Sequence, residues 1–374
     1  MASPIKKKTI IITVTTTTNI EVEDTMTVAD FKSLIQQQQH VPTDRQRVVF
    51  KGKDLEDNKK LSFYEIKQET TLQVIAKLKA TLWTLQKSAT DNCWSSVTFG
   101  NNLFVAVSMT GTGNRVMTSP DGLEWTLRKS PAKDNNWTSI TFGNNLFVAV
   151  SNTGTGDRVM TCPDGVKWTI QKSAADNDWI SVTFGNNLFV AVSATGKGNR
   201  VMTSPDGIAW TLQKSAADNN WCAVTFGNNL FVAVSISGTG DRVMTSPDGV
   251  KWTLRKSAAD HFWRSVTFGN NLFVAVSVSG TGDRVMTSPD GVTWTLQTSA
   301  ADNCWYSVTF GNNLFVAVSN TGTGDRVMTS PDGKKWTLQT SAADNAWCSI
   351  AFGNYFFVAV SYTGTGNHVM TACG

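Results

Sequence analysis

An acidic residue close to an aromatic one recurs through most of the chain, and such a pair could belong to a sugar-hydrolysing site. The segment Ser119–Trp125 reads SPDGLEW, and it returns five more times as CPDGVKW, SPDGIAW, SPDGVKW, SPDGVTW and SPDGKKW. The same residue types also suit a tight turn that a repetitive fold would need many times. The other acidic residues of the chain help to decide between these two interpretations.

Glycoside hydrolysis generally needs two placed carboxylates or their equivalent, and the repeats supply few candidates. Glu124 is the only glutamate in residues 81–374, so the tyrosines of that region have no glutamate partner there. Equivalent residues of near-identical repeats have near-equal environments, whereas acid and base roles require environments that differ. We therefore predict a protein that is not an enzyme and that uses no cofactor and no metal. A sialidase-like glycosidase is the least favoured of the three functions that we consider.

Composition narrows the class of partner. The 374 residues carry a net charge of +4 and 17% charged residues, which does not suggest binding to nucleic acid or to a membrane surface. No apolar run approaches the roughly 20 residues of a membrane-spanning helix. The six cysteines lack the matched spacing of a metal site or a disulfide framework, so we interpret them as free thiols. We expect a cytoplasmic monomer.

The composition changes near residue 80, because all 14 tryptophans lie beyond that point. The preceding residues predict a β-hairpin over 9–14 and 19–23, followed by a helix that begins at Val28 with Thr27 as its N-cap. Two more strands are predicted at 47–50 and 71–78. We therefore expect an α+β domain at residues 1–79 and a separate repetitive domain at residues 80–374.

The segment DRQRVVFKGKDLEDNKKLSFYEIKQETTLQVIAKLKA is similar to ubiquitin throughout, and TVADFKSLIQQQQHVPTDRQ extends the similarity upstream. The resemblance implies a β-grasp fold with a partner-docking patch on its sheet. That patch falls on Val49, Gly52, Gln73 and Ile75, and Lys53 stands where ubiquitin carries a chain-linking lysine. Val49 and Ile75 would then be exposed apolar residues of the patch, the alternative being scattered surface residues.

Two departures from ubiquitin matter. The first hairpin is shorter, and Lys79-Ala80 replaces the terminal Gly-Gly of the family. Without that tail we expect an integral docking domain rather than a conjugated tag.

Beyond residue 80 the chain repeats with a period of 42 residues, interrupted by one extra residue between Trp125 and Trp137. Each unit predicts four short strands, which in the first unit span 94–99, 103–108, 115–119 and 124–130. A period in the forties with several strands per unit is typical of a β-propeller. We therefore predict an all-β domain of seven four-stranded blades.

The number of turns predicts how this ring closes. Each strand occurs seven times, but the Pro-Asp-Gly turn between the third and fourth strands occurs only six times. The missing turn lies between residues 371–374 and residues 81–83, the two ends of the repeat region. We therefore expect the first and last strands of the region to pair, which leaves no open sheet edge. A linear solenoid is the alternative, but it would need distinct caps, and the sequence shows none.

Ser-Pro-Asp-Gly suits a type I turn, with the following tryptophan packed over it. The motif also resembles the Asp-box of sialidase-type propellers, although it has one residue fewer between Asp and Gly. The resemblance implies a position between the third and fourth strands, far from a catalytic centre. We interpret the motif as structural.

The remaining candidates lie in the loops that precede each first strand and follow each second strand. They are Asp91, Asn92, the second tryptophan series (Trp94, Trp137, Trp179, Trp221, Trp263, Trp305 and Trp347), the arginine series (Arg115, Arg158, Arg200, Arg242, Arg284 and Arg326) and His368. The residues on either side of the second tryptophan differ most between units: Cys93 and Ser95, Asn136 and Thr138, Asp178 and Ile180, Asn220 and Cys222, Phe262 and Arg264, Cys304 and Tyr306, and Ala346 and Cys348. Simpler interpretations are an inter-blade core for the tryptophans, ion pairs for the arginines and neutral drift for the variable positions.

Two functions fit these loops. A protein-binding platform would use the variable positions as one asymmetric patch, whereas a lectin would use Asp, Asn and Trp at seven equal sites. We favour an adaptor in which the ubiquitin-like domain docks to partners of the ubiquitin or proteasome pathway and the propeller recognises a protein. Glycan binding is the alternative.

Overall fold

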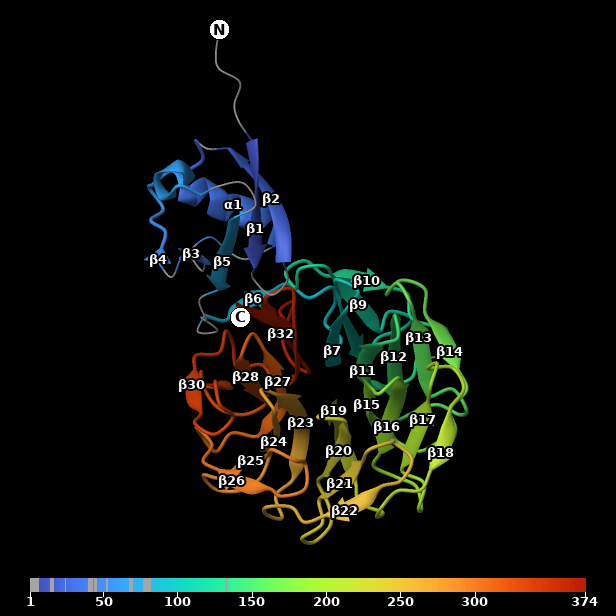
Figure 1. Ribbon diagram of the computed structural model, residues 1–374. Coiled ribbons are helices and arrows are strands. Elements are labelled where there is room, and N and C mark those ends of the chain that lie inside the picture. Colours follow the sequence, from blue (N-terminus) through green and yellow to red (C-terminus); the bar gives the residue numbers. More distant parts are fainter. Residues whose placement is uncertain are drawn as a thin grey trace. The chain divides into compact units, whose positions relative to one another are not determined.

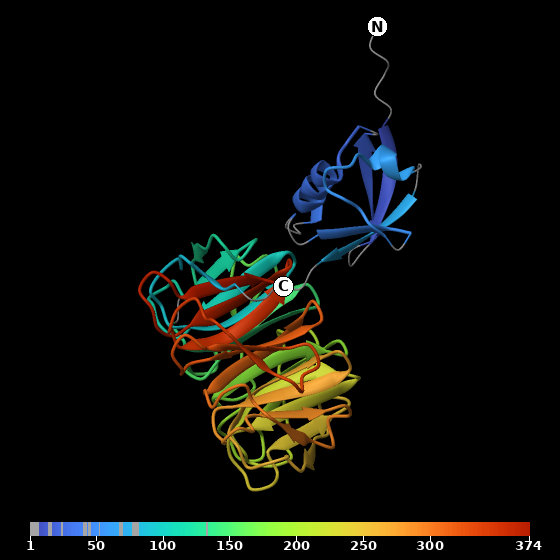
Figure 2. The same ribbon diagram turned by 90° about the vertical axis from the view of Figure 1, so that its left-hand side faces the viewer.

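The computed structural model describes residues 7–13, 17–23, 25–39, 43, 46–51, 53–66, 70–76, 82–131 and 134–374. The chain divides into two compact units, Met1–Lys79 and Ala80–Gly374, and Figures 1 and 2 show both from two directions. No helix within these ranges is both long enough and apolar enough to cross a membrane.

The first unit is a five-stranded sheet with one helix on it (Figure 2). In sheet order its strands are β2 (Thr17–Glu23), β1 (Lys7–Thr13), β5 (Thr70–Ala76), β3 (Gln46–Phe50) and β4 (Lys53–Asp54). The central strands β1 and β5 are parallel, and the other pairs are antiparallel. Helix α1 (Val28–Gln39) and a 3-10 helix (Leu61–Tyr64) complete the unit. The predicted β-grasp fold is confirmed.

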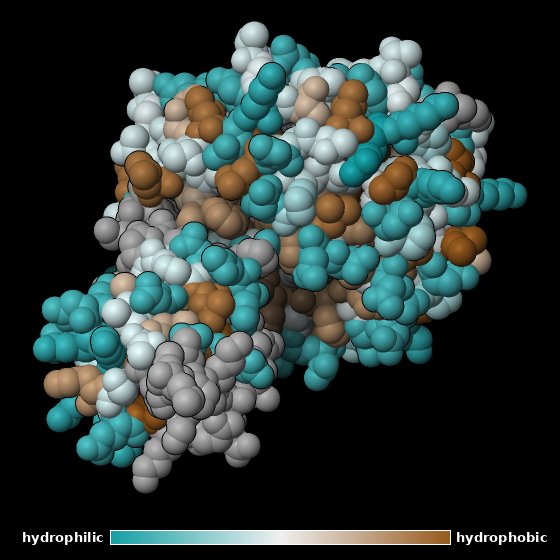
Figure 3. Space-filling model, turned by 90° about the horizontal axis from the view of Figure 1, so that it is seen from above, coloured by the Kyte–Doolittle hydropathy of each residue, from teal (hydrophilic) through white to brown (hydrophobic). Residues whose placement is uncertain are grey.

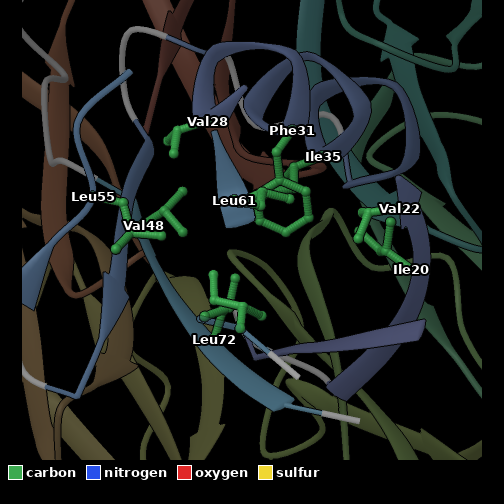
Figure 4. Packing of buried hydrophobic residues seen from close by; sticks show 10 residues of the cluster. Ile20, Val22, Val28, Phe31, Ile35, Val48, Leu55, Leu61 and Leu72 are labelled. Carbon is green, nitrogen blue, oxygen red and sulfur yellow. The ribbon is translucent and has the colours of Figure 1, made fainter. Parts of the chain in front are cut away.

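Helix α1 begins where the sequence predicts. The backbone N–H of Asp30 donates to Thr27 Oγ1 (3.1 Å), and the Thr27 N–H donates back to Asp30 Oδ2 (3.3 Å). This reciprocal cap satisfies two backbone donors that a helix start otherwise leaves free. One face of the helix then buries its apolar residues against the sheet (Figure 4). The buried cluster consists of Ile20, Val22, Val28, Phe31, Ile35, Val48, Leu55, Leu61, Ile66 and Leu72.

The second unit is a ring of seven four-stranded sheets, as predicted (Figure 1). The first strand of each blade lies innermost: β7 (Trp94–Gly100), β11 (Trp137–Gly143), β15 (Trp179–Gly185), β19 (Trp221–Gly227), β23 (Trp263–Gly269), β27 (Trp305–Gly311) and β31 (Trp347–Gly353). Next come β8 (Leu103–Ser108), β12 (Leu146–Ser151), β16 (Leu188–Ser193), β20 (Leu230–Ser235), β24 (Leu272–Ser277), β28 (Leu314–Ser319) and β32 (Phe356–Ser361).

The outer half of each blade is shorter. The third strands are β9 (Val116–Ser119), β13 (Val159–Cys162), β17 (Val201–Ser204), β21 (Val243–Ser246), β25 (Val285–Ser288), β29 (Val327–Ser330) and β33 (Val369–Cys373). The rim strands are β10 (Thr126–Arg128), β14 (Thr169–Gln171), β18 (Thr211–Gln213), β22 (Thr253–Arg255), β26 (Thr295–Gln297), β30 (Thr337–Gln339) and β6 (Thr84–Gln86). We number the blades 1 to 7 in the order of their innermost strands.

Blade 7 contains strands from both ends of the repeat region. Strand β33 pairs antiparallel with β6, with Val369 opposite Gln86 and Thr371 opposite Thr84. The sheet order β31-β32-β33-β6 therefore takes its rim strand from the beginning of the region. The ring needs no Pro-Asp-Gly turn at this place, because the chain does not connect these two strands directly.

The junction between neighbouring blades depends on a glycine at the end of each innermost strand. A methyl group at Gly100 would lie 2.0 Å from the Phe142 ring of blade 2, and one at Gly353 would lie 2.0 Å from the Phe99 ring of blade 1. The same glycine–phenylalanine contact therefore recurs at the junction that closes the ring. It sets how closely the innermost strands approach one another, and these strands surround the central channel.

Candidate functional site

The Pro-Asp-Gly turns are closed hydrogen-bonding units. In blade 4, Asp248 Oδ1 accepts the N–H groups of Val250 and Lys251 (both 2.9 Å) and the hydroxyl of Ser246 (2.9 Å). The indole of Trp252 donates to the Gly249 carbonyl (2.9 Å). The backbone N–H groups of Lys251 and Val250 lower the pKa of Asp248, which keeps it an ionised acceptor rather than a proton donor. The turns are therefore structural.

The tryptophans of the second series are not a binding surface. Trp94, Trp137, Trp179, Trp221, Trp263, Trp305 and Trp347 are all fully buried. The Trp94 indole donates to the Thr90 carbonyl (3.1 Å), and equivalent bonds recur in several other blades. The prediction that these rings lie on an exposed loop face was wrong. Large apolar rings at the start of the innermost strands fill the space between blades.

The arginine series ties neighbouring loops together. In blade 1, Arg115 Nη1 donates to the carbonyls of Met109 (2.6 Å) and Asn135 (3.0 Å), and Nε lies 3.6 Å from Asp134. Asp134 also accepts the N–H of Gly113 (2.8 Å). Arg158, Arg200, Arg242, Arg284 and Arg326 have equivalent ion pairs with loop aspartates.

Blade 7 has a histidine at the position of these arginines, and its Nδ1 lies 3.2 Å from the Ser361 carbonyl oxygen. His368 Nε2 lies 3.4 Å from Asp91, and His368 is only 2% exposed. Nearby, Asn92 Nδ2 donates to the Asn114 carbonyl (3.0 Å). These polar loop residues are engaged within the protein, so the ion-pair interpretation of the arginines is the one that the geometry supports.

The proposed patch on the ubiquitin-like unit is only partly described. Val49 is 7% exposed, so our expectation that it contributes exposed apolar surface was wrong. It stands opposite Asp54, whose carboxylate bonds the guanidinium of Arg47 on the same face (2.9 Å). Lys53 is exposed. Gln73 and Ile75 belong to β5, opposite Val49 and Arg47, while their side chains and the whole of Gly52 lie outside the described part.

The variable residues after each second-series tryptophan do come together. They line a cavity of about 230 Å³ in the central channel: Ser95, Thr138, Ile180, Cys222, Arg264, Tyr306 and Cys348. The next residue of each innermost strand, usually serine, also lines it, as in Ser96 and Ser139. These serines tie neighbouring blades, since Ser96 Oγ accepts the Ile140 N–H (3.2 Å) and Ser139 Oγ accepts the Val182 N–H (3.2 Å).

At the variable position, a small hydroxyl or thiol group forms a hydrogen bond to the next blade. Ser95 Oγ donates to the Trp137 carbonyl of the next blade (2.5 Å), and Thr138 Oγ1 donates to the Trp179 carbonyl (2.6 Å). Thiols do the same in Cys222 (2.9 Å to Trp263) and Cys348 (3.0 Å to Trp94). Ile180, Arg264 and Tyr306 have no hydroxyl or thiol at that place. The fold does not require a large side chain there.

Arg264 and Tyr306 instead pair with each other across blades 5 and 6. Arg264 Nη2 donates to the Tyr306 hydroxyl (2.7 Å), and the guanidinium carbon lies 4.4 Å from the centre of the Tyr306 ring. The Tyr362 ring of blade 7 meets the Tyr306 ring edge-on at 5.9 Å. We call these three residues the channel cluster.

The electrostatics of the channel cluster are set by burial. Burial alone would lower the pKa of Arg264, but the hydrogen bond to Tyr306 raises it, and the guanidinium stays charged. Burial raises the pKa of the Tyr362 hydroxyl well above its usual value, so that group stays protonated. The cluster therefore presents one positive charge and hydroxyl donors.

A wider cavity of about 760 Å³ adjoins the channel on the loop side. Its lining consists of Cys93, Met109, Thr110, Gly111, Thr112, Arg115, Asn136, Tyr306 and Tyr362. Met109, Tyr306 and Tyr362 line both cavities, so this one is the mouth of the channel.

Sequence reasoning missed Met109 and Tyr362, which occupy equivalent positions after the second strand. That position reads Met109, Asn152, Ala194, Ile236, Val278, Asn320 and Tyr362 around the ring. Comparing the seven units column by column would have found it, because it varies as much as the positions beside the tryptophan.

Exposed apolar side chains on the rim line separate cavities that are smaller than the channel mouth, of about 570 Å³ beside Ile208 and Trp210 and about 370 Å³ beside Val250 and Trp252. Positions after the Pro-Asp-Gly turns are exposed, among them Val166, Ile208 and Val250. In Figure 3 the brown apolar residues of the propeller surface stand apart, divided by teal polar ones. Single exposed apolar residues are normal on soluble proteins, so the channel mouth is the better candidate.

Comparison with known proteins identifies the first unit. Residues 10–79 match the model of the ubiquitin family. The chain is 37% identical over 59 residues to ubiquitin-like protein 4A of Oryctolagus cuniculus, covering 16% of this chain and 38% of that protein. It is 41% identical over 58 residues to ubiquitin-like protein 4B of Monodelphis domestica, covering 16% and 32%. The chain thus spans less than two fifths of these curated relatives.

The second unit resembles solved propellers. Virginiamycin B lyase from Staphylococcus aureus aligns with a TM-score of 0.66 and 11% identity, over 78% of this chain and 98% of that one. YCF48 bound to D1 peptide aligns with a TM-score of 0.59 and 16% identity, over 78% and 97%. The computationally designed Ika8 protein aligns with a TM-score of 0.53 and 17% identity, over 74% and 84%. These identities show the fold alone.

The chain therefore combines a ubiquitin-like domain with a β-propeller that follows it. The propeller has seven blades of four strands, with a polar channel and an asymmetric mouth on its loop side. One structural neighbour is a lyase by name and another holds a peptide. Among the residues described here, no group of three or more His, Cys, Asp or Glu could hold a metal ion.

Proposed function

We propose that this chain is a non-enzymatic adaptor, in which the ubiquitin-like domain docks to one partner and the channel mouth of the propeller binds another protein. One observation carries the propeller half of this proposal. The first strands are nearly identical except at the positions that line the channel, and the residues after the second strands differ where they line its mouth. The residues after the Pro-Asp-Gly turns also differ, but they are exposed separately on the rim, where neutral drift is expected, whereas the channel positions line one shared cavity.

The types of residue found at the channel positions also support a binding site there. Four blades keep a small hydroxyl or thiol that bonds the next blade, whereas blades 5 and 6 replace it with Arg264 and Tyr306. These two large side chains replace a bond between blades with a paired cation and phenol in the channel. Polar groups converging on a concave site are the usual mark of a binding pocket.

The docking half rests on the ubiquitin-like domain. Its relatives are named as ubiquitin-like proteins, and we propose receptors of the ubiquitin or proteasome pathway as its partners, acting in the cytoplasm. Lys53 is an exposed member of the suggested patch. Because Val49 is buried, Ile75→Asp on β5 is the more direct test of this patch. Loss of a captured partner, with an unchanged thermal transition of the domain, is the expected result.

Glycan binding is the alternative function for the propeller, and glycosidase activity the third. A lectin built on the second tryptophan series lacks stacking surfaces, because those rings are fully buried. A glycan array tests the lectin directly, and a sialidase substrate assay tests the hydrolase. A dose-dependent glycan signal that the channel variant described next leaves unchanged would contradict a protein-binding channel.

The test of the propeller half uses substitutions that the repeat itself supplies. The channel variant Arg264→Ser, Tyr306→Thr, Tyr362→Asn carries residues found at the same positions of blades 1 and 2 (Ser95, Thr138 and Asn152). A control variant, Ala209→Thr, Lys251→Thr, Thr293→Ala, makes the same change in net charge at the Pro-Asp-Gly turns. We expect affinity capture with quantitative mass spectrometry to show that the channel variant loses partners that the wild type and the control retain. Identical partners for all three proteins would contradict the proposal.

A further inference from the structure

We propose that the channel cluster of Arg264, Tyr306 and Tyr362 is a carboxylate-binding site, which anchors an acidic group of the protein that enters the channel mouth. This inference rests on the proposed function and names the chemistry of its ligand. The structural basis is a charged guanidinium that projects into a cavity and that the described residues leave without an acidic partner.

The charge of Arg264 differs in its surroundings from the charges of the arginine series. Arg115 and its five equivalents each have a loop aspartate within 4.0 Å. Within the ranges that the structure describes, no such ion pair involves Arg264, and the residues lining the channel include no Asp, Glu or Lys. A partly buried charge without a counter-charge costs free energy, so its presence calls for a compensating ligand.

The hydrogen-bonding capacity of the pair suits an anion with two oxygens. The Tyr306 hydroxyl accepts a bond from Arg264 Nη2, so its own hydrogen remains available as a donor. The guanidinium has further N–H groups in a planar fork that matches a carboxylate. Stacking on the Tyr306 ring at 4.4 Å holds that fork in place. The site is thus organised before the ligand arrives, which lowers the entropic cost of binding.

The size of the channel limits what can bring this carboxylate. A cavity of about 230 Å³ admits a side chain or the end of an extended chain but no folded element. The wider mouth, lined by Met109, Tyr306 and Tyr362, would contact the apolar part of the same ligand. Two sources of the group therefore fit: the C-terminal carboxylate of a polypeptide, or the side chain of a Glu or Asp residue within it.

Small probes with matched neutral controls separate these sources. N-acetyl-leucine carries a terminal carboxylate, and N-acetyl-leucinamide is its neutral control. N-acetylglutamate amide carries a side-chain carboxylate, and N-acetylglutamine amide is its neutral control. Binding to the full chain is followed by NMR signals of isotope-labelled tyrosine rings and arginine Nε–H groups, with each probe added up to tens of millimolar.

We expect saturable shifts of the Tyr306, Tyr362 and Arg264 signals with at least one carboxylate and at least tenfold weaker binding of its neutral control. Arg264→Ser should abolish saturation, Arg264→Lys should weaken it because the fork is lost, and Tyr306→Phe should weaken it while the ring stacking persists. Arg255→Ser, which removes an arginine from the rim strand β22, should leave binding unchanged. The same Ser occupies the equivalent channel position in blade 1, so Arg264→Ser is compatible with the fold.

Other outcomes refute the inference. Absence of saturable shifts in the wild type, equal binding of charged and neutral probes, or unchanged binding by Arg264→Ser would each overturn the carboxylate site. Such a failure is distinguishable from failure of the adaptor. If the channel variant still loses captured proteins, the channel binds a partner through other chemistry, whereas unchanged capture refutes both.

Discussion

Replacing a glycine at a blade junction should be much more damaging than replacing one in an open loop, and the propeller offers a matched pair. A methyl group at Gly185 would lie 2.1 Å from Phe226 Cγ and 2.4 Å from its Cβ. Because the Cβ is fixed by the backbone, rotating the ring cannot relieve the clash, and strand β19 must move. Overpacking of this kind costs about 1–3 kcal/mol and sometimes more, so we expect about 3 kcal/mol for Gly185→Ala.

Gly198 is the control. It has a φ of +71°, and a methyl group there would have nothing within 4 Å. Gly198→Ala therefore adds only the strain of a left-handed conformation, about 1 kcal/mol. Tryptophan fluorescence during urea unfolding reports on the propeller alone, because all 14 tryptophans lie in it. A smaller loss of stability for Gly185→Ala than for Gly198→Ala would refute the glycine–phenylalanine junction as the feature that spaces the innermost strands.

Two further predictions concern the channel wall and the turns. Ser95→Ala removes a buried hydroxyl that bonds the carbonyls of Val107 and Trp137, so we expect a loss of about 1–2 kcal/mol by urea unfolding. Ser95→Thr, the residue of blade 2, should restore most of it, and equal stability of the Ala and Thr variants would contradict the inter-blade bond. The Cys162 thiol and the N–H groups of Val166 and Lys167 lower the pKa of Asp164 to about 2. Its stabilising effect should therefore be complete above pH 4, its approximate pKa when unfolded, and disappear as the pH falls toward 2. Asp164→Asn should flatten this part of the pH profile of the urea midpoint, and an unaltered profile would contradict the role of the turn carboxylate.

The fold could be predicted from the sequence because its signals are local and repeated. The 42-residue period, the four short apolar runs and the six Pro-Asp-Gly turns each report on one unit at a time. The helix start was equally local, since Thr27 and Asp30 are three residues apart. Val49 could not be placed in this way, because its burial depends on its neighbours in the sheet as well as on its own strand.

The site was harder to predict because it is formed by the ring. Arg264 and Tyr306 belong to different blades and are 42 residues apart, and only closure of the propeller brings them together with Tyr362. The tryptophan series recurs with the same period whether it lies in the core or at the surface, so the repeat alone could not decide its burial. The variable residues beside these tryptophans were the signal that pointed to the site. The equally variable position of Met109 and Tyr362, after the second strand, is a second such signal.

The central claim is that a partner protein enters the channel mouth, and site-specific photocrosslinking tests it most directly. A photoreactive phenylalanine analogue replaces Tyr362 at the mouth in one protein and Lys251 at a Pro-Asp-Gly turn in another. We expect irradiation of the captured complexes to attach partner peptides at position 362 and not at position 251, with the attachment at 362 lost when Arg264→Ser is added. Crosslinks from position 251 alone, or crosslinks from 362 that are indifferent to Arg264→Ser, would contradict this account.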